Sequence, residues 1–488
     1  MKFKYLLTVI ALLAITKGSF AQYSQDAIRY STFQTGSTSR VKAIGNAGTA
    51  IGGDLSSIAG NPAGLGFFTK SEFSITPEFD ASKVNAGYLN QNNSASKSSG
   101  NLNNVSWELY NRLNTPPGQD KDKGWLSVNF GFGYFRTNDY GQNIVAVGKN
   151  NSSSITDYYA NLANTNGLAD GSLQKWAFDH NLIDQYGTPP AYASNTFTGA
   201  AQLNSITRSG GESEFDIAMG ANYSNKLYLG ISLGLTDLQY NSTNSFNEIG
   251  VASVIEGSSP VSRNYNSTYL QTQNTKGSGV NVKLGLIYKP IDAIRIGATI
   301  TTPTYYSIDD SYNEGLSTSF SSGVVYNSGP TNYPLSYSLT TPFKAAGGVA
   351  FFLGQLGFIS GDVEYIDYSS TRLHDTDGYD SSFDNTDIKT LYKATVNMHA
   401  GAEIRLPMGV LLRGGYSVQG SPVKQDGKST NTISGGLGYH AGSYYVDITY
   451  ANIKGSQILT PYTAGSVTPT ASLSQTNNNV FVTFGYRY

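Results

Sequence analysis

The 488-residue chain contains no cysteine, which excludes disulfide bonds, thiolate metal sites and a lipid-modified cysteine behind a leader. Charged residues are also scarce: they make up 14% of the chain, against about 25% in soluble domains. A formal net charge of −2 offers no basic face to nucleic acid. A soluble protein of this length needs a charged exterior, so the composition argues against a string of soluble globular domains.

Long hydrophobic runs are missing as well, apart from one near the amino terminus. The opening MKFKYLLTVIALLAITKGSFA has two lysines, Lys2 and Lys4, before an apolar run from Tyr5 to Ile15, and small residues at Ser19 and Ala21. This layout predicts a secretory signal peptide over residues 1–21, cut before Gln22. The run is too short to be a membrane anchor, and no later run approaches 18 residues, so no transmembrane helix is expected.

What the chain has instead is strict alternation of apolar and polar residues. In LYLGISLGLT (227–236), every second residue from Leu227 to Leu235 is apolar. Residues 393–405 and 444–450 show the same period of two. This period predicts strands with one face in an apolar medium, and about ten residues suffice for a tilted strand to cross a bilayer.

The connections between these runs sort into two kinds. Six short turns are expected near 137–139, 225–226, 290–292, 354–355, 407–408 and 441–443. Seven long polar segments alternate with them, at about 90–123, 150–212, 241–276, 304–340, 369–390, 419–429 and 454–476. Thirteen connections imply fourteen strands, with short turns at one end and long loops at the other. The predicted fold is all-β: a 14-stranded antiparallel transmembrane β-barrel over residues 70–488.

The last residues, NNNVFVTFGYRY, support a barrel. Val480, Val482, Phe484, Tyr486 and Tyr488 share one face, and this looks like the carboxy-terminal strand signal of outer-membrane barrels. The alternative is a large secreted β-sandwich or propeller. Such a protein would also alternate, but its connections need not sort into short and long sets.

The segment before the first strand contains SRVKAIGNAGTAIGGDLSSIAGNPAGLGFFTKSEFSI. It resembles the amino-terminal hatch of the FadL/TodX-type family of outer-membrane transporters of hydrophobic compounds. LTTPFKAAGGVAFFL (339–353), GDVEYIDYSS (361–370), GVLLRGGYS (409–417) and ISGGLGYHAGSYYVDITYANI (433–453) are similar to the same family. The resemblance implies that residues 22–69 form a hatch that plugs the lumen.

The resemblance also implies a function. We expect passive transport of small hydrophobic compounds, long-chain fatty acids or aromatic hydrocarbons, across the bacterial outer membrane, with outer-membrane lipid and the hydrophobic ligand as partners. Some barrels of the family instead act in protein secretion or surface anchoring, where the partner is another cell-envelope protein. Both alternatives stay open on the sequence.

Within the hatch, Asn61-Pro62-Ala63 is the centre of a glycine-rich turn. Pro62 fixes φ, Asn61 can organise a turn, and Gly64 permits close packing. We expect these four residues and Asp54 to act in gating. The alternative is a plain turn that leads into the first strand.

Charged residues lie close to several predicted short turns, on the polar side of their strands. Counting from each turn puts them at a similar depth: Arg295, Glu403, Arg405, Arg413 and Arg487. We expect an internal belt that pairs with Asp54 or Glu72 and anchors the hatch. The alternative is a set of ion pairs that merely fills the lumen.

The second long loop contains SLQKWAFDHNLIDQYG (172–187), preceded by Tyr158 and Tyr159. Leu173, Trp176 and Ile183 fall at helical spacing, which predicts an amphipathic helix. In the resembled family such loop helices form an extracellular groove where a hydrophobic ligand lands. The alternative is a helix packed on neighbouring loops.

No cofactor, metal or catalytic centre is expected. The segment DTDGYDSSFDNTD (375–387) spaces carboxylates like a calcium loop but lacks the closing glutamate, so a solvated acidic loop is favoured. His180, His374, His399 and His440 show no ligand spacing, and no local signature selects a nucleophilic serine. We therefore do not expect an enzyme.

Overall fold

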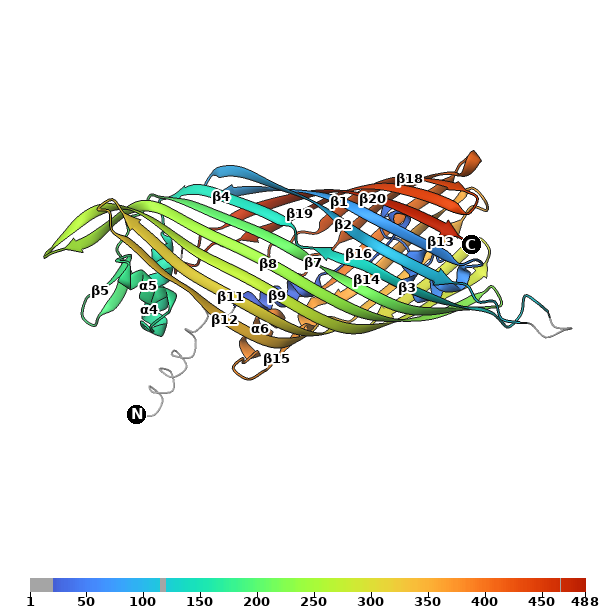
Figure 1. Cartoon of the computed structure of the whole chain (residues 1–488), viewed down its shortest axis with the longest axis horizontal. Helices are drawn as coiled ribbons and strands as arrows, with labels where there is room; N and C mark the ends of the chain where they lie inside the picture. The colour runs from blue at the N-terminus through green and yellow to red at the C-terminus, as the bar shows by residue number, and fades with distance from the viewer. Residues whose placement is uncertain (1–20, 115–119, 466) are drawn as a thin grey trace.

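The structure is a computed structural model that describes residues 21–114, 120–465 and 467–488. The predicted signal peptide, apart from Ala21, lies outside the described residues. The chain forms one antiparallel sheet that closes on itself, because β1 (Glu72–Tyr88) pairs with β2 (Gln91–Leu109) on one side and with the last strand, β20 (Ala471–Arg487), on the other. Figure 1 shows the resulting elongated barrel.

The chain passes along the barrel wall from one end to the other many times, and four of these passes consist of two strand segments each. β3 (Trp125–Asp139) and β4 (Gln142–Asn150) both pair with β7 (Ala200–Tyr223). β10 (Ile294–Thr301) and β11 (Tyr305–Phe320) both pair with β9 (Ser259–Ile291). The other two are β12 (Val325–Thr340) with β13 (Lys344–Phe352), and β14 (Gly357–Asp367) with β15 (Arg372–His374).

Each of the other passes is a single strand. Besides β1, β2, β7, β9 and β20, these are β8 (Leu227–Glu256), β16 (Ala394–Arg405), β17 (Val410–Gln419), β18 (Thr430–Ala441) and β19 (Tyr444–Leu459). The described residues thus make fourteen passes along the wall, which confirms the predicted number of strands. We call the end that carries the carboxyl terminus the turn end, and the opposite end the loop end (Figure 1).

Two predicted connections are wrong and offset each other. Residues 137–139 are not a turn, because β3 runs on into β4 along the same neighbour. The predicted loop 90–123 contains β2, a full strand paired with β1. Segments 241–276 and 304–340 are also largely strand: β8 meets β9 as far as Glu256↔Ser259, and β11 pairs with β12 over nearly its whole length.

Alternation sorts the side chains as predicted. On β8, Leu229, Ile231 and Leu233 are exposed on the outer face, while Tyr228 and Ser232 are buried in the lumen. The wall has uneven height, because β7, β8 and β9 have 24, 30 and 33 residues and β16, β17 and β18 only 12, 10 and 12. Only residues 338–340 of β12 pair with β15, and towards the loop end the described ladders leave β12 paired with β11 alone. Residues 325–337 therefore form a free edge, which contains Pro330 and Pro334.

The N-terminal segment, residues 22–69, lies inside the barrel (Figure 1). It contains α2 (Ala21–Ser31), α3 (Ser39–Ala43) and two 3-10 helices, η1 (Leu55–Ile58) and η2 (Pro62–Phe67). At the loop end lie α4 (Ile155–Asn166), α5 (Leu173–Asp179) and the hairpin of β5 (Ile183–Tyr186) and β6 (Ala191–Ser194). Smaller elements are η3 (Tyr368–Ser370), α6 (Ser382–Leu391) and η4 (Pro407–Gly409). Of the helices in the described ranges, none has the length and apolar character to cross a bilayer.

Candidate functional site

Asn61 ties the turn of the N-terminal segment to the barrel wall. Its side-chain oxygen accepts a hydrogen bond from the Ala63 amide at 3.2 Å and so caps η2. Its Nδ2 donates to three backbone carbonyls: Thr49 at 2.7 Å, Leu286 on β9 at 3.2 Å and Ala298 on β10 at 3.3 Å. One amide therefore organises the turn and also joins it to two strands.

The strands of the wall carry glycine where they face this turn. A Cβ added to Gly230 on β8 would lie 2.2 Å from the carbonyl carbon of Pro62. A Cβ on Gly285 of β9 would lie 1.9 Å from Asn61 Oδ1. Within the segment, a Cβ on Gly64 would meet Ser57 Oγ at 2.3 Å. The close packing expected of the hatch glycines therefore depends equally on glycines of the strands.

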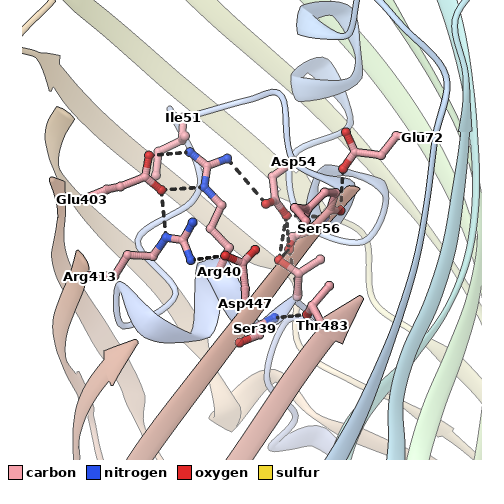
Figure 2. Close-up of polar contacts among 12 residues, drawn as sticks. Ser39, Arg40, Ile51, Asp54, Ser56, Glu72, Glu403, Arg413, Asp447 and Thr483 are labelled. Atoms are coloured by element: carbon pink, nitrogen blue, oxygen red, sulfur yellow. Dashed lines mark hydrogen bonds and ion pairs between the residues drawn. The ribbon is translucent and has the colours of Figure 1, made fainter. Parts of the chain in front are cut away.

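Arg40 on α3 is the centre of the charged contacts, as Figure 2 shows. Its Nε donates to Glu403 Oε2 at 2.7 Å and its Nη2 to Oε1 at 3.2 Å. Arg413 Nε donates to the same carboxylate at 2.9 Å, and its Nη1 to Asp447 Oδ1 at 2.5 Å. Glu403 and Arg413 are buried. The sequence analysis missed Arg40, because only tertiary packing brings it to β16.

Asp54 lies on the other side of Arg40, with 3.6 Å between Oδ2 and Nη1. It also caps η1 by accepting from the Ser56 amide at 2.9 Å, and accepts from Thr38 Oγ1 at 2.9 Å. Among the residues that the structure describes, Asp54 therefore reaches the belt only through Arg40. Its hydrogen bonds are all made within the N-terminal segment.

The other belt residues divide between the segment and the wall. Arg295 donates to the Ile51 carbonyl, and its guanidinium lies 4.2 Å from the ring centre of Phe67. Glu72 on β1 instead accepts from Arg487 Nε and Tyr445 Oη, both at 2.6 Å, and so joins three strands of the wall. Arg405 is 3.3 Å from Glu403. Glu72, Arg295, Glu403, Arg405 and Arg487 all line one open recess of about 770 Å³ at the turn end.

Further hydrogen bonds hold the segment to strands on several sides of the lumen. The Thr49 amide donates to Asp362 on β14 at 2.7 Å, and Asn129 on β3 donates to the Leu65 carbonyl at 2.7 Å. The Ser39 amide donates to Thr483 Oγ1 on β20 at 2.9 Å. The segment is therefore fixed around the circumference and not along one seam.

A cavity of about 260 Å³ lies between the N-terminal segment and the wall. Its lining mixes rings and aliphatic groups, such as Phe33, Val41 and Phe481, with charged groups, such as Lys42, Glu78 and Glu364. The Lys42 ammonium lies 5.3 Å from the ring centre of Phe481. Among the described residues it has no carboxylate within 4 Å.

Helix α2 packs in the lumen among tyrosines. Tyr30 Oη donates to Thr275 at 3.1 Å, and its ring contacts Tyr140 and Tyr240 edge-on, with centroids 6.2 and 5.9 Å apart. Asp26 pairs with Arg29 and accepts from Gln273 at 2.7 Å. These contacts fill the lumen around α2.

The predicted groove residues lie at the loop end, in or beside a cap that consists of α4, α5 and the β5–β6 hairpin. Tyr159, Leu173, Trp176 and Ile183 are buried together against residues of β8, β9 and β11, and Tyr158 packs at their border. They form a closed core and not an open groove, because the tall strands supply an apolar partner that the sequence analysis had not assigned to this loop. Their role in ligand binding would require this core to open and stays a prediction.

Two carboxylates of the acidic segment 375–387 accept hydrogen bonds within the segment, and one of them also binds α2. Asp375 accepts from the Ser381 amide at 2.8 Å, while Asp384 accepts from Tyr379 Oη at 2.8 Å and from the Ser24 amide of α2 at 3.0 Å. Within residues 21–114, 120–465 and 467–488, no three side chains of the metal-binding types are grouped to hold an ion.

The four histidines lie apart, each with a local partner. His399 Nδ1 is 2.8 Å from the Gly45 carbonyl oxygen, and His374 Nε2 is 2.8 Å from Thr340 Oγ1. His440 lies 3.8 Å from Asp447. In the cap, His180 is 3.1 Å from Thr318 Oγ1 and 2.9 Å from Ser328 Oγ, and burial lowers its pKa to about 4.

Comparison with solved structures shows that the fold of this barrel is similar to that of known channels. A Pseudomonas aeruginosa FadL homologue superposes with a TM-score of 0.55 at 11% identity, over 93% of this chain and 99% of that one. A deltaS2 mutant of the TodX monoaromatic hydrocarbon channel superposes with a TM-score of 0.52 at 13% identity, again over 93% and 99%. No protein-family model matches the sequence, and neither does any curated protein. The chain thus has the 14-stranded barrel fold of the FadL and TodX channels.

Proposed function

We propose that this chain is a bacterial outer-membrane channel for small, largely apolar compounds, with residues 22–69 as its hatch. The observation that carries the proposal is the cavity of about 260 Å³ between the N-terminal segment and the wall. Its volume is close to the lower end of the roughly 300–1,000 Å³ that small-molecule sites occupy. No energy-coupling motif is apparent in the sequence, so passage would be downhill.

The lining favours an amphipathic compound over a bare hydrocarbon. The rings of Phe33 and Phe481 would hold an apolar chain, and the Lys42 ammonium would meet an anionic group. Placing a hydrocarbon against Glu78 and Glu364 would remove water from those groups without replacing its hydrogen bonds, which is costly. Of the two expected substrate classes, a long-chain fatty acid is therefore the better fit.

The test compares uptake of oleate and toluene in a strain that lacks the chain and is complemented with variants. Lys42→Met should lower oleate uptake severalfold and leave toluene uptake unchanged. The matched control is Lys70→Met, because Lys70 lies outside the cavity, in the recess at the turn end. Equal uptake of oleate with and without the chain would refute the proposal.

A second candidate is a barrel that anchors or passes exported proteins. It is favoured by the outer face of the tall strands, where a polar stretch of β8 that includes Asp237 and Asn247 is followed by exposed Ile249, Val251 and Ile255. Exposed apolar residues so far beyond the apolar surface that faces lipid suit a protein partner. If deletion of the chain releases surface proteins into the medium and leaves oleate uptake intact, this candidate replaces the first.

A further inference from the structure

On β1 and β20, the outer face of the barrel changes from apolar to polar side chains towards the loop end. On β1, the exposed Phe73, Ile75 and Phe79 are followed on the same face by Lys83 and Asn85. On β20, Tyr486 and Phe484 are followed by Ser474 and Ser472. Because successive side chains of a strand point to opposite faces, these residues all lie on the lipid side of the wall.

Tyrosines mark the border between the two regions. Tyr450 Oη on β19 donates to Asn478 Oδ1 at 2.7 Å, and Tyr416 Oη on β17 donates to Asn431 Oδ1 at 3.2 Å. Tyrosine is enriched where a membrane protein passes from hydrocarbon to head groups, since one end of its ring is apolar and the other polar. The border therefore fits the level of the lipid head groups.

An open groove of about 1,020 Å³ lies directly beyond this border. Asn85, Asn92, Ser456 and Ser474 line it together with two lysines, Lys428 and Lys454, and no Asp or Glu does so. In the part of the chain that the structure describes, neither ammonium group has an ion-pair partner. Lys83 adds a third cation close to Asn85 on the same face.

We infer that this groove binds the phosphorylated sugar head group of an outer-leaflet glycolipid. The asparagines and serines offer donors and acceptors to sugar hydroxyls, and the lysines offer charge to phosphates. The apolar surface on the same face of these strands, towards the turn end, would hold the acyl chains of the same molecule. The inference rests on the outer-membrane location in the proposed function.

The width of the groove distinguishes a glycolipid from a phospholipid. Its lining runs from Lys428 beside β18 to Asn92 on β2, which spans five neighbouring strands. Four inter-strand spacings of about 4.8 Å give a width of about 19 Å. A head group of two or more sugars can reach both edges, whereas a single glycerol phosphate cannot.

The test is native mass spectrometry of the detergent-extracted full chain with three lipids: diphosphoryl lipid A, its dephosphorylated form, and phosphatidylglycerol. The diphosphorylated lipid should bind at least tenfold better than either of the others, in line with the electrostatic gain per lysine. Lys428→Gln combined with Lys454→Gln should abolish this preference. The matched control, Lys226→Gln with Lys276→Gln, removes two exposed lysines outside the groove and should keep it.

Unchanged binding in the Lys428 and Lys454 double variant would overturn the inference, and so would equal binding of phosphatidylglycerol. Neither result depends on transport. Oleate uptake without glycolipid selectivity would count against this inference alone, and glycolipid selectivity without uptake would count against the proposed function alone.

Discussion

Arg40 of the N-terminal segment and Glu403 of β16 are joined by two hydrogen bonds, of 2.7 and 3.2 Å. The same carboxylate accepts from Arg413, so a single buried anion serves a cation of the segment and a cation of the wall. This arrangement makes Glu403 the point at which the anchoring hypothesis is most directly tested.

Glu403→Gln should loosen the N-terminal segment and raise single-channel conductance in planar bilayers. It removes the buried carboxylate that Arg40 and Arg413 share, so that, among the described carboxylates, Arg413 keeps only Asp447 and Arg40 only the more distant Asp54. Breaking a buried pair in this way costs about 3–5 kcal/mol. Glu72→Gln is the control, because Glu72 pairs with Arg487 inside the wall. Equal conductance of wild type and Glu403→Gln would contradict an anchoring role for this carboxylate.

Gly230→Ala should displace η2 from the wall, since the new Cβ would lie 2.2 Å from a Pro62 backbone atom. Overpacking of this kind costs about 1–3 kcal/mol. Thermal unfolding, followed by the loss of the compact band on unheated gels, should shift downward. Gly414→Ala is the matched control, because no atom lies within 4 Å of its added Cβ. A shift as large in the control would remove the explanation.

Trp176→Ala should open the cap at the loop end. Trp176 is buried in a core shared with β8, β9 and β11, and a truncation of this size in a core costs about 3–5 kcal/mol. The chain has no cysteine, so Thr301→Cys in the cavity lining gives a clean probe. A polar maleimide added from outside should label it faster in the Trp176→Ala background. Trp125→Ala, at a half-exposed position at the turn end, should not speed labelling.

The cap should also loosen in acid through His180. Its pKa is about 4 when packed and about 6.5 when exposed, so the opened cap binds the proton more tightly. The stability that the neutral imidazole contributes is therefore lost as pH falls from 6.5 towards 4. Hydrogen exchange at residues 173–183 should increase over this window in the wild type and stay flat in His180→Gln. A flat profile in the wild type would show that His180 does not set the cap's stability.

The sequence predicted the transmembrane part of the wall well and the part outside it poorly. Where lipid is present, one face must be apolar, and residues such as Leu229 to Leu235 carry the signal. Beyond the lipid, the strands keep their hydrogen bonds but no longer need an apolar face, so 241–276 reads as a loop and is strand. The strand count survived because β2 was missed while β3 and β4 were separated.

The charged belt was predictable only in part. Counting from turns placed Glu403, Arg405 and Arg295 at one depth, and the structure does bring them to one recess. Depth along a strand says nothing about which side chain of the N-terminal segment meets them. Arg40 lies more than 300 positions from Glu403, and only the path of the segment through the lumen brings the two together.

The free edge of β12 bears on how neighbouring copies coexist in a crowded membrane. An unpaired strand that projects beyond the bilayer offers backbone donors and acceptors to the same strand of an adjacent barrel. Pro330 and Pro334 each lack an N–H, so two such edges cannot form a continuous ladder across residues 325–337. The two prolines thereby prevent continuous strand pairing between adjacent barrels on the tall side of the wall.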